Sequence, residues 1–198
     1  MKLLEEEIRK RGQILPGNVL KVNSFLNHKI DPMLLEAMAE EWYQKFKNEN
    51  ITKVVTVESS GIAMAILVAL KFKCELVFAK KGKASTLGNV MTASIYSYTK
   101  SVDVLISIEN GYIKEDDNVL IIDDFLANGS AVAGLISIIK YAKANVKGIG
   151  IAIEKGFQDG GKQLRKQGYR VESLAIIKEM DYNSNAIVFD SEEEKNEN

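Results

Sequence analysis

One segment, residues 119–131 with the sequence VLIIDDFLANGSA, constrains the fold of this chain more than any other. Four branched apolar residues run directly into Asp123 and Asp124, and a short Asn-Gly loop follows. A continuous apolar run of this kind is typical of a strand buried on both faces in a parallel sheet. Helical spacing of apolar residues resumes after Ser130. The segment therefore predicts a strand, a turn and a helix within an α/β fold.

The two aspartates and the loop after them indicate the kind of ligand. Open α/β sheets bind ligands outside the carboxyl ends of their strands, where Asp123 and Asp124 are expected. Carboxylates accept hydrogen bonds from a sugar diol, and the free N–H groups of a helix N-terminus favour a phosphate. The combination suggests a phosphorylated ribose. Taken singly, each feature also fits a polar strand end or an ordinary turn with Ser130 as the N-cap.

The rest of the chain alternates between strand and helix patterns. Strands are predicted at 54–57, 75–79, 148–153 and 169–177, and helices at 62–72 and 158–167. Residues 92–99 and 102–109 are expected to form a hairpin around Lys100 and Ser101, and residues 82–90 a mobile loop. The alternation indicates a mainly parallel sheet with right-handed crossovers.

A separate N-terminal region precedes this alternation. Residues 2–11 predict a short amphipathic helix, and residues 12–22 are expected to be irregular, with a turn at the Pro-Gly pair at 16–17. Asp31 followed by Pro32 predicts the start of a second helix, because aspartate is a preferred N-cap and proline a preferred first helical residue.

Length and composition limit the class of protein. A chain of 198 residues predicts one domain over residues 1–190, followed by a disordered acidic tail at 191–198. The 26 Lys and Arg against 27 Asp and Glu give no basic excess, so no nucleic-acid partner is expected. The single cysteine excludes an intrachain disulfide and is typical of a reducing compartment. With no targeting segment or long apolar stretch, the chain is expected to be cytoplasmic and without a membrane partner.

Several common ligand-binding motifs are absent from the sequence. It contains neither the P-loop pattern nor the Gly-x-Gly-x-x-Gly pattern of dinucleotide-binding folds, and no Cys/His cluster with metal-ligand spacing. These absences argue against a P-loop nucleotidase and a dinucleotide-dependent enzyme.

Residues 119–131 resemble the ribose-phosphate-binding signature of the type I phosphoribosyltransferases. Members of this family transfer the phosphoribosyl group of 5-phospho-α-D-ribose 1-diphosphate (PRPP) to a nucleobase and release pyrophosphate. Further segments are similar to the xanthine branch of the family: 20–28, 58–61, 77–81, 92–97 and 153–155. The resemblance implies a type I fold, with a mainly parallel central sheet, helices on both faces, a flexible hood loop or hairpin, and a small N-terminal hood subdomain formed by residues 1–30.

Two positions depart from the wider family pattern. Asn128 stands in the phosphate loop where most members have threonine, and the xanthine branch is similar to this chain in that respect. Lys80 stands where relatives often carry arginine, which keeps the positive charge but loses a bidentate donor. The first departure favours the xanthine branch, and the second leaves the pyrophosphate contacts open.

The resemblance also implies roles for residues along the sheet edge. Asp123 and Asp124 are expected to be the catalytic pair that binds the ribose hydroxyls and stabilises positive charge on the ribose. PRPP is expected to bind at Ala127, Asn128, Gly129, Ser130 and Ala131. Pyrophosphate is assigned to Ser59, Ser60, Gly61, Lys80 and Lys81, and the hood loop to Tyr96 and Ser97. A solvated strand end and a surface hairpin remain alternatives for these last two sets.

The purine is assigned to three residues by the same resemblance. Lys155 would bind the 6-oxo group, because an ammonium only donates hydrogen bonds. Asn27 would bind the 2-oxo side that distinguishes xanthine from hypoxanthine, and Leu20 would pack against the base. An exposed lysine is the alternative for Lys155, and His28 is interpreted as structural.

These assignments imply a pentosyltransferase of purine salvage that converts xanthine and PRPP into xanthosine 5′-monophosphate (XMP) and pyrophosphate. Mg²⁺ is expected as a cofactor bound mainly through PRPP, with no metal site formed by the protein alone. A homodimer is expected from the family. Two alternatives remain open, a guanine/hypoxanthine phosphoribosyltransferase and a PRPP-sensing purine-operon regulator. The regulator would need a DNA-binding module, and the N-terminal helix is too short for a winged helix.

Overall fold

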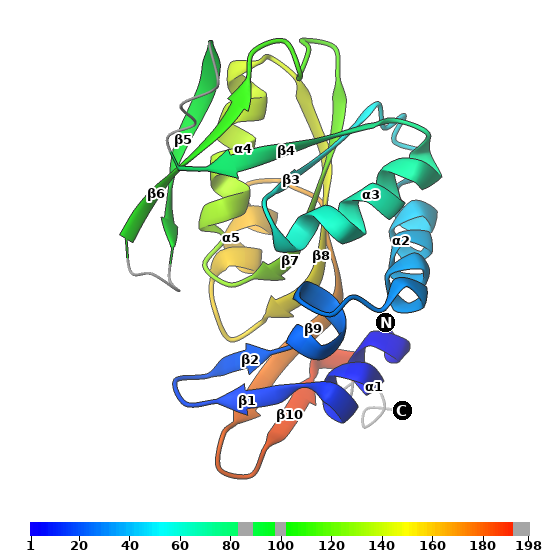
Figure 1. Ribbon diagram of the computed structural model, residues 1–198, viewed down its shortest axis with the longest axis vertical. Helices are drawn as coiled ribbons and strands as arrows, with labels where there is room; N and C mark the ends of the chain where they lie inside the picture. The colour runs from blue at the N-terminus through cyan, green and yellow to red at the C-terminus, as the bar shows by residue number, and fades with distance from the viewer. Residues whose placement is uncertain (83–88, 98–101, 192–198) are drawn as a thin grey trace.

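The computed structural model describes residues 1–82, 89–97 and 102–191 (Figure 1). Its helical segments are α1 (Lys2–Arg11), the π-helical turn η1 (Asn23–Asn27), α2 (Pro32–Phe46), α3 (Ser60–Phe72), α4 (Ser130–Tyr141) and α5 (Gly160–Lys166). Its strands are β1 (Gln13–Leu15), β2 (Val19–Lys21), β3 (Lys53–Val57), β4 (Glu75–Lys81), β5 (Val90–Ser97), β6 (Val102–Glu109), β7 (Asn118–Leu126), β8 (Asn145–Lys155), β9 (Val171–Asp181) and β10 (Ala186–Phe189).

The main sheet has the strand order β10-β9-β8-β7-β3-β4-β6-β5. The strands from β9 to β4 in this order are parallel, and the outer pairs are antiparallel. β1 and β2 form a separate antiparallel hairpin. The mainly parallel sheet confirms the predicted fold class, and it places the carboxyl ends of the central strands at one edge, where such folds bind ligands.

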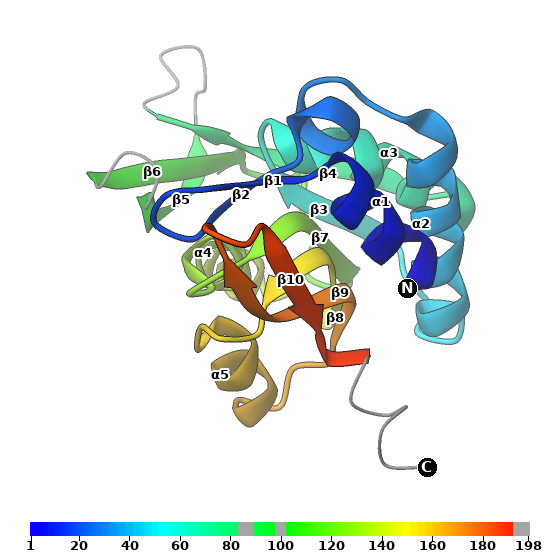
Figure 2. The ribbon, with the colours of Figure 1, turned by 90° about the horizontal axis from the view of Figure 1, so that it is seen from below.

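Two apolar clusters cover the two faces of the sheet. In β7, Leu120 and Ile122 belong to the cluster that includes α2 and α3, whereas Val119 and Ile121 belong to the cluster that includes α4 and α5. All four side chains are fully buried. Figure 2 shows these helix pairs on opposite sides of the sheet. The continuous apolar run is thus explained by a strand that is covered on both faces.

The predicted start of α2 and the predicted hairpin agree with the structure, although β5 begins at Val90, inside the predicted loop at 82–90. The Asp31 carboxylate accepts a hydrogen bond from the Leu34 amide at 3.3 Å, and Pro32 is the first residue of α2. β5 and β6 pair in register from Val90 with Glu109 to Ser97 with Val102, so the predicted hairpin is confirmed. Its turn at Lys100 and Ser101, residues 83–88 of the predicted mobile loop and tail residues 192–198 lie outside the described residues.

The prediction of irregular backbone over residues 12–22 was wrong. These residues include β1 and β2, in which Ile14 pairs with Leu20 and both side chains are buried. Gly17 and Asn18, in the turn between them, have φ values of 79° and 58°. Strands of three residues are too short to show a periodic pattern. The strand β10, which pairs with β9, was not predicted either.

The N-terminal elements form one unit with the C-terminal strands at the lower end of Figure 1. Leu4 and Ile8 of α1 are fully buried, and Arg9 Nη1 donates to the Ile187 carbonyl of β10 at 2.7 Å. The Met1 amino group donates to the Leu174 carbonyl of β9. No helix in the described ranges is both long and apolar enough to cross a membrane.

Candidate active site

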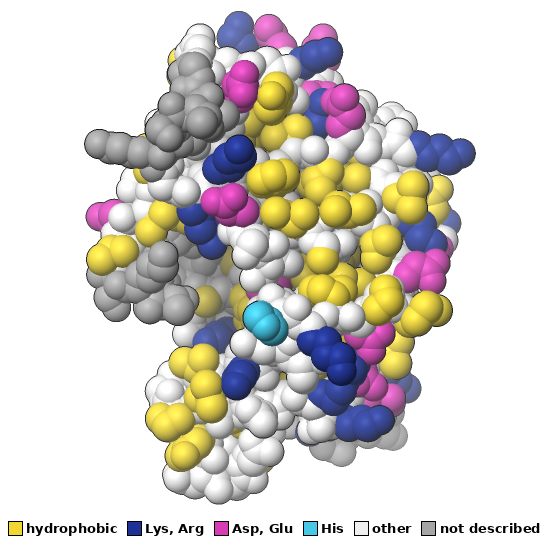
Figure 3. Space-filling view, viewed as in Figure 1, with side chains coloured by type: hydrophobic (Ala, Val, Ile, Leu, Met, Phe, Trp, Pro, Cys, Tyr) yellow, Lys and Arg dark blue, Asp and Glu magenta, His cyan; other side chains and the backbone are white. Residues whose placement is uncertain are grey.

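A cavity of about 560 Å³ opens at the carboxyl ends of β3 and β7. It is lined by Val57, Glu58, Ser60, Lys81, Gly82, Ile95, Tyr96, Val104, Asp123, Asp124, Phe125, Leu126, Ala127, Asn128, Gly129, Ser130, Ala131 and Val132. The structure therefore brings the predicted acidic pair, the whole predicted phosphate loop, one serine and one lysine of the predicted pyrophosphate set, and Tyr96 to one cavity. In Figure 3 the outline of the molecule is indented between the β5–β6 region and the β1–β2 hairpin.

The acidic pair lies on the cavity wall within β7, which continues to Leu126 rather than ending before the pair. Asp123 is 6% exposed, and its Oδ1 accepts a hydrogen bond from the Asp124 amide at 3.0 Å. Burial, and then the charge of Asp124, raise the pKa of Asp123 well above its ordinary value, while the charge of Lys81 acts in the opposite direction. Burial also raises the pKa of Asp124. Two adjacent carboxylates, one buried and one half-buried, are suited to stabilise a positive charge that develops beside them.

The loop after β7 has the geometry of an anion cradle. Gly129 has a φ of 80°, a conformation that favours glycine, and it is the N-cap of α4. The first turn of α4 has no side-chain cap, so its backbone N–H groups are oriented toward the loop and remain available to a phosphate. Ser130 is the first helical residue, not the N-cap. Its Oγ accepts a hydrogen bond from the Tyr96 amide at 2.7 Å, which joins the β5–β6 hairpin to the loop.

The turn after β3 forms another wall of the cavity. Glu58 and Ser60 line it, and the Glu58 carboxylate accepts a hydrogen bond from the Lys81 amide at 2.6 Å. Gly61 has no room for a side chain, because a Cβ there would overlap the Thr56 hydroxyl and lie 3.5 Å from Asp123 Oδ1. The turn is thereby held against the acidic pair. Ser59 and Lys80, which were assigned to the same set, do not line the cavity.

The three residues assigned to the purine lie outside the cavity lining. Asn27 is linked to it, because its Nδ2 donates to Asp124 Oδ2 at 3.0 Å, and its Oδ1 is buried without a hydrogen-bond partner among the described residues. Lys155 Nζ donates to the Asn18 carbonyl in the β1–β2 turn at 3.1 Å, and burial lowers the pKa of Lys155. Leu20 is buried in the apolar cluster that includes α1 and α2. Ser97, the second hood residue, pairs with Val102 through its backbone, and its side chain lies outside the described part of the structure.

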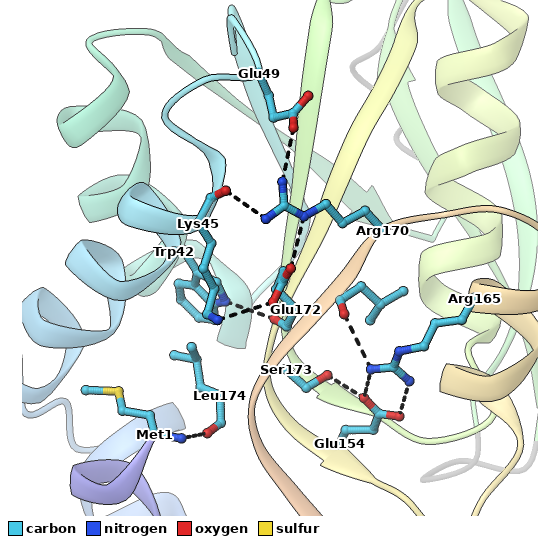
Figure 4. A network of polar contacts seen from close by, with 11 residues as sticks. Met1, Trp42, Lys45, Glu49, Glu154, Arg165, Arg170, Glu172, Ser173 and Leu174 are labelled. Carbon is cyan, nitrogen blue, oxygen red and sulfur yellow. Dashed lines mark hydrogen bonds and ion pairs between the residues drawn. The ribbon is translucent and has the colours of Figure 1, made fainter.

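A charged network around the buried Glu154, behind the phosphate loop, was not predicted. Figure 4 shows Glu154 of β8 between Arg165 of α5 and Ser173 of β9. Arg165 donates to both carboxylate oxygens at 2.7 and 2.8 Å, and the Ser173 hydroxyl also donates to Glu154. Burial raises the pKa of Glu154, but the hydrogen bonds from Arg165 and Ser173 outweigh it and lower the pKa overall. The adjacent glycines at 160–161 are the sequence signal that could have indicated close packing here.

Comparison with known proteins identifies the family. The model of the phosphoribosyl transferase domain matches residues 21–193 of the chain. This chain belongs to the phosphoribosyltransferase family. The match includes the acidic pair, the phosphate loop and the turn after β3.

Similar phosphoribosyltransferases cover the chain almost completely. It is 53% identical over 194 residues to a xanthine phosphoribosyltransferase of Bacillus cereus, covering 98% of each chain. It is 54% identical to a xanthine phosphoribosyltransferase of Ligilactobacillus salivarius, covering 98% of this chain and 100% of the relative. The crystal structure of a Trypanosoma brucei adenine phosphoribosyl transferase is similar in fold, with a TM-score of 0.73 at 15% identity, covering 87% of this chain and 79% of that chain. The predicted family and fold are thus confirmed.

Proposed function

We propose that this phosphoribosyltransferase transfers the 5-phosphoribosyl group of PRPP to xanthine, giving XMP and pyrophosphate. The observation that carries the proposal is identity of 53–54% over nearly the whole length of curated xanthine phosphoribosyltransferases. The cavity supports it chemically, because it combines carboxylates for a ribose diol with a helix N-terminus for a phosphate. We further propose a role in purine salvage in the cytoplasm.

The proposed reaction forms one bond and breaks one bond at the ribose. A ring nitrogen of xanthine bonds to C1 of the ribose, and the bond from C1 to the diphosphate oxygen breaks. Pyrophosphate leaves with the electron pair, and the displaced proton of the base passes to solvent. Asp123 and Asp124 accept hydrogen bonds from the ribose hydroxyls and stabilise the positive charge on the ring. The positive charge of Lys81 and the amides of the turn at Ser60 bind the departing pyrophosphate.

The 5′-phosphate is assigned to the loop at 127–131. Its backbone N–H groups hold the phosphate, and Ser130 donates its hydroxyl proton to it while accepting from the Tyr96 amide. Holding both ends of PRPP aligns C1 with the incoming base, and alignment of two reactants contributes several kcal/mol, about 7–11 kcal/mol in the best cases.

The oxygen-only donor set near the ribose fits Mg²⁺ that is bound mainly through PRPP. Mg²⁺ prefers oxygen ligands and retains waters, and it would neutralise charge on the diphosphate. The carboxylates of Asp123 and Asp124 are the protein groups that would approach it. In the part of the chain that the structure describes, no group of three His, Cys, Asp or Glu side chains could hold a metal ion.

The purine is assigned to the space between the acidic pair and the hood. Asn27, held by Asp124, directs a buried Oδ1 without a partner that can accept a hydrogen bond from a ring N–H. Lys155, held by the Asn18 carbonyl, donates to the 6-oxo group. Leu20 supports the base from the β1–β2 hairpin.

A competition assay tests the proposed function. The purified protein is supplied with PRPP and Mg²⁺ and offered xanthine, guanine, hypoxanthine and adenine separately, with nucleotide formation followed by chromatography. We expect the highest kcat/KM for xanthine. Higher kcat/KM for guanine or hypoxanthine would instead assign a guanine/hypoxanthine enzyme, and absence of transfer to every base would refute the activity.

We also propose that the protein forms a homodimer through an apolar surface. Exposed apolar side chains include Ile66 and Leu70 of α3, which are 51% and 70% exposed, and Phe78 of β4. Figure 3 shows hydrophobic side chains gathered on the face that carries α3 and β4. Light scattering after size exclusion should give twice the chain mass, and Leu70→Glu should shift the equilibrium toward monomer. A wild-type monomer at micromolar concentration would refute the dimer.

A further inference from the structure

An ion pair between the buried Glu154 and the more exposed Arg165 lies directly behind the phosphate loop and is connected to it through α5. Glu154 is 3% exposed and stands beside Leu126 in the register of β7 and β8, at the level where the loop begins. Arg165 of α5 binds both of its oxygens, and Arg165 also donates to the Val171 carbonyl of β9 at 3.4 Å. A buried carboxylate is strongly unfavourable without such partners. The pair therefore holds α5 in one position against the sheet.

The start of α5 touches the phosphate loop through backbone atoms alone. The Gly160 amide donates to the Ala127 carbonyl at 3.1 Å. A Cβ on Gly160 would overlap that carbonyl and lie 2.6 Å from the Gly129 amide nitrogen. On the other side, a Cβ on Gly161 would overlap the Glu154 carboxylate and lie 2.7 Å from Arg165 Nη1. The two glycines thus fit closely between the ion pair and the loop, with no space for a side chain on either side.

The helix itself has little stability of its own. α5 has 7 residues and no side-chain hydrogen bond at its N-cap. Isolated helices shorter than about 12–15 residues are marginal in water, so contacts with the sheet must determine where α5 lies. Among these contacts, the bidentate pair between Arg165 and Glu154 is directional, because the planar guanidinium and the carboxylate meet in one geometry.

We infer that Glu154 and Arg165 are positioning residues for the 5′-phosphate, acting through Gly160 on the loop at Ala127–Gly129. The inference rests on the proposed function only in assigning the phosphate to this loop. Neither charged residue lines the cavity, so both act without touching the substrate. The ion pair of Glu154 and Arg165, which we call the brace, sets the direction of the loop amides. Pyrophosphate binding at the turn after β3 does not depend on the brace.

A matched arginine provides the control. Arg170 is on the far side of the same network in Figure 4, where it donates to Glu49, Glu172 and the Lys45 carbonyl at 2.8–3.0 Å. It makes as many polar contacts as Arg165 but none with α5 or the loop in the contacts found among the described residues. Arg165→Ala and Arg170→Ala therefore each remove three polar contacts, those of Arg170 being the more exposed, and only the first removes the brace.

The experiment measures binding of two ligands by calorimetry, ribose 5-phosphate and pyrophosphate. We expect Arg165→Ala to raise the Kd for ribose 5-phosphate about tenfold or more, because hydrogen bonds to a charged group are misdirected. The Kd for pyrophosphate should stay within about twofold of the wild-type value. Arg170→Ala should leave both within about twofold. Equal loss of both ligands in Arg165→Ala, no loss of ribose 5-phosphate, or an equal loss in Arg170→Ala would each overturn the inference.

Two further variants keep the test decisive if Arg165→Ala does not fold. Glu154→Gln keeps one carbonyl acceptor for Arg165, and Gly160→Ala leaves the ion pair intact while pushing on the loop. Both variants should have a lower affinity for ribose 5-phosphate and an unchanged affinity for pyrophosphate. A variant with wild-type affinity for both ligands contradicts the inference. The wild-type transfer assay is read separately. A wild type that binds ribose 5-phosphate but does not use xanthine refutes the proposed function and leaves this test valid.

Discussion

The contact between α4 and the β5–β6 hairpin makes a sharp prediction at Gly134. A Cβ at this position would lie inside 3.0 Å of Ile95 Cγ2 and 3.1 Å from Ile106 Cδ1. Overpacking a tight core contact costs about 1–3 kcal/mol. Replacing a helical glycine by alanine gains about 1 kcal/mol of helix propensity. Gly134→Ala should therefore destabilise the protein by up to about 2 kcal/mol, the difference between the two effects.

A double-mutant cycle separates the two effects. Ile95→Ala removes Cγ2 and the rest of a side chain that is 5% exposed, and it should cost about 2–5 kcal/mol by itself. In that background the overlap with Ile95 Cγ2 is gone and the end of the Ile106 side chain has only to shift slightly, so Gly134→Ala should stabilise by up to about 1 kcal/mol through helix propensity. The effect of Gly134→Ala thus changes sign, with a coupling energy of about 1–3 kcal/mol.

Urea unfolding, monitored by circular dichroism with equal m-values required, measures all four proteins of the cycle. Ala133→Gly is the control, because Ala133 is an exposed neighbour in the same helix and reports propensity without the contact. Its cost should be the same with Ile95 or alanine at position 95. If Gly134→Ala has the same effect in both backgrounds, the close approach of hairpin and helix does not limit this position.

Three further predictions concern the charged residues. Asp123→Asn should abolish transfer, and it should raise the unfolding temperature of the ligand-free protein by an amount that grows with pH, because burial and the charge of Asp124 disfavour the ionised form of Asp123; a difference that does not grow with pH contradicts this. Glu154→Gln should lower the free energy of unfolding at neutral pH, and the difference from wild type should shrink below pH 4.5, the ordinary pKa of the carboxyl. A lowered carboxyl pKa contributes stability above the ordinary pKa and loses it as pH falls through the folded pKa. A difference that is independent of pH in urea titrations would refute this. Lys155→Ala should raise KM for xanthine more than KM for PRPP in steady-state assays, and an unchanged KM for xanthine would remove Lys155 from the purine site.

Sequence patterns predicted the parallel core because its signals are local. The Asp31-Pro32 pair determines the start of α2 as predicted, whereas the apolar run before Asp123 locates β7 but not its end, because the strand continues to Leu126. The β1–β2 hairpin depends instead on packing between Ile14 and Leu20 and on contacts with distant strands. A pattern of three residues does not carry that information, so this region was predicted as irregular.

The candidate site likewise combines residues that a local motif predicts with contacts between distant segments that it does not predict. The acidic pair and the loop at 127–131 are contiguous, so one motif was enough to place them together. The links from Asn27 to Asp124 and from Tyr96 to Ser130 span 97 and 34 residues, and they could be seen only once the chain was folded. The brace of Glu154 and Arg165 could likewise be seen only in the folded chain, because no sequence motif contains Arg165 and its link to the loop runs through Gly160.

The carboxyls of Asp123 and Asp124 lower the stability of the ligand-free protein, and ligand binding can recover the stability that they cost. The pKa of Asp123 is raised above its ordinary value of 3.8, so the free energy of unfolding falls as pH rises from that value through the folded pKa. When both carboxyls are ionised, the ligand-free protein carries an unfavourable pair of charges with only partial relief from Lys81 and Asn27. A ligand that brings hydroxyl donors and positive charge to the pair removes that cost on binding. Ligand-induced stabilisation should consequently grow with pH in the wild type and lose this dependence in Asp123→Asn. Glu154 is already paired and its pKa is lowered, so its contribution to the free energy of unfolding changes with the opposite sign, rising with pH in the acid range.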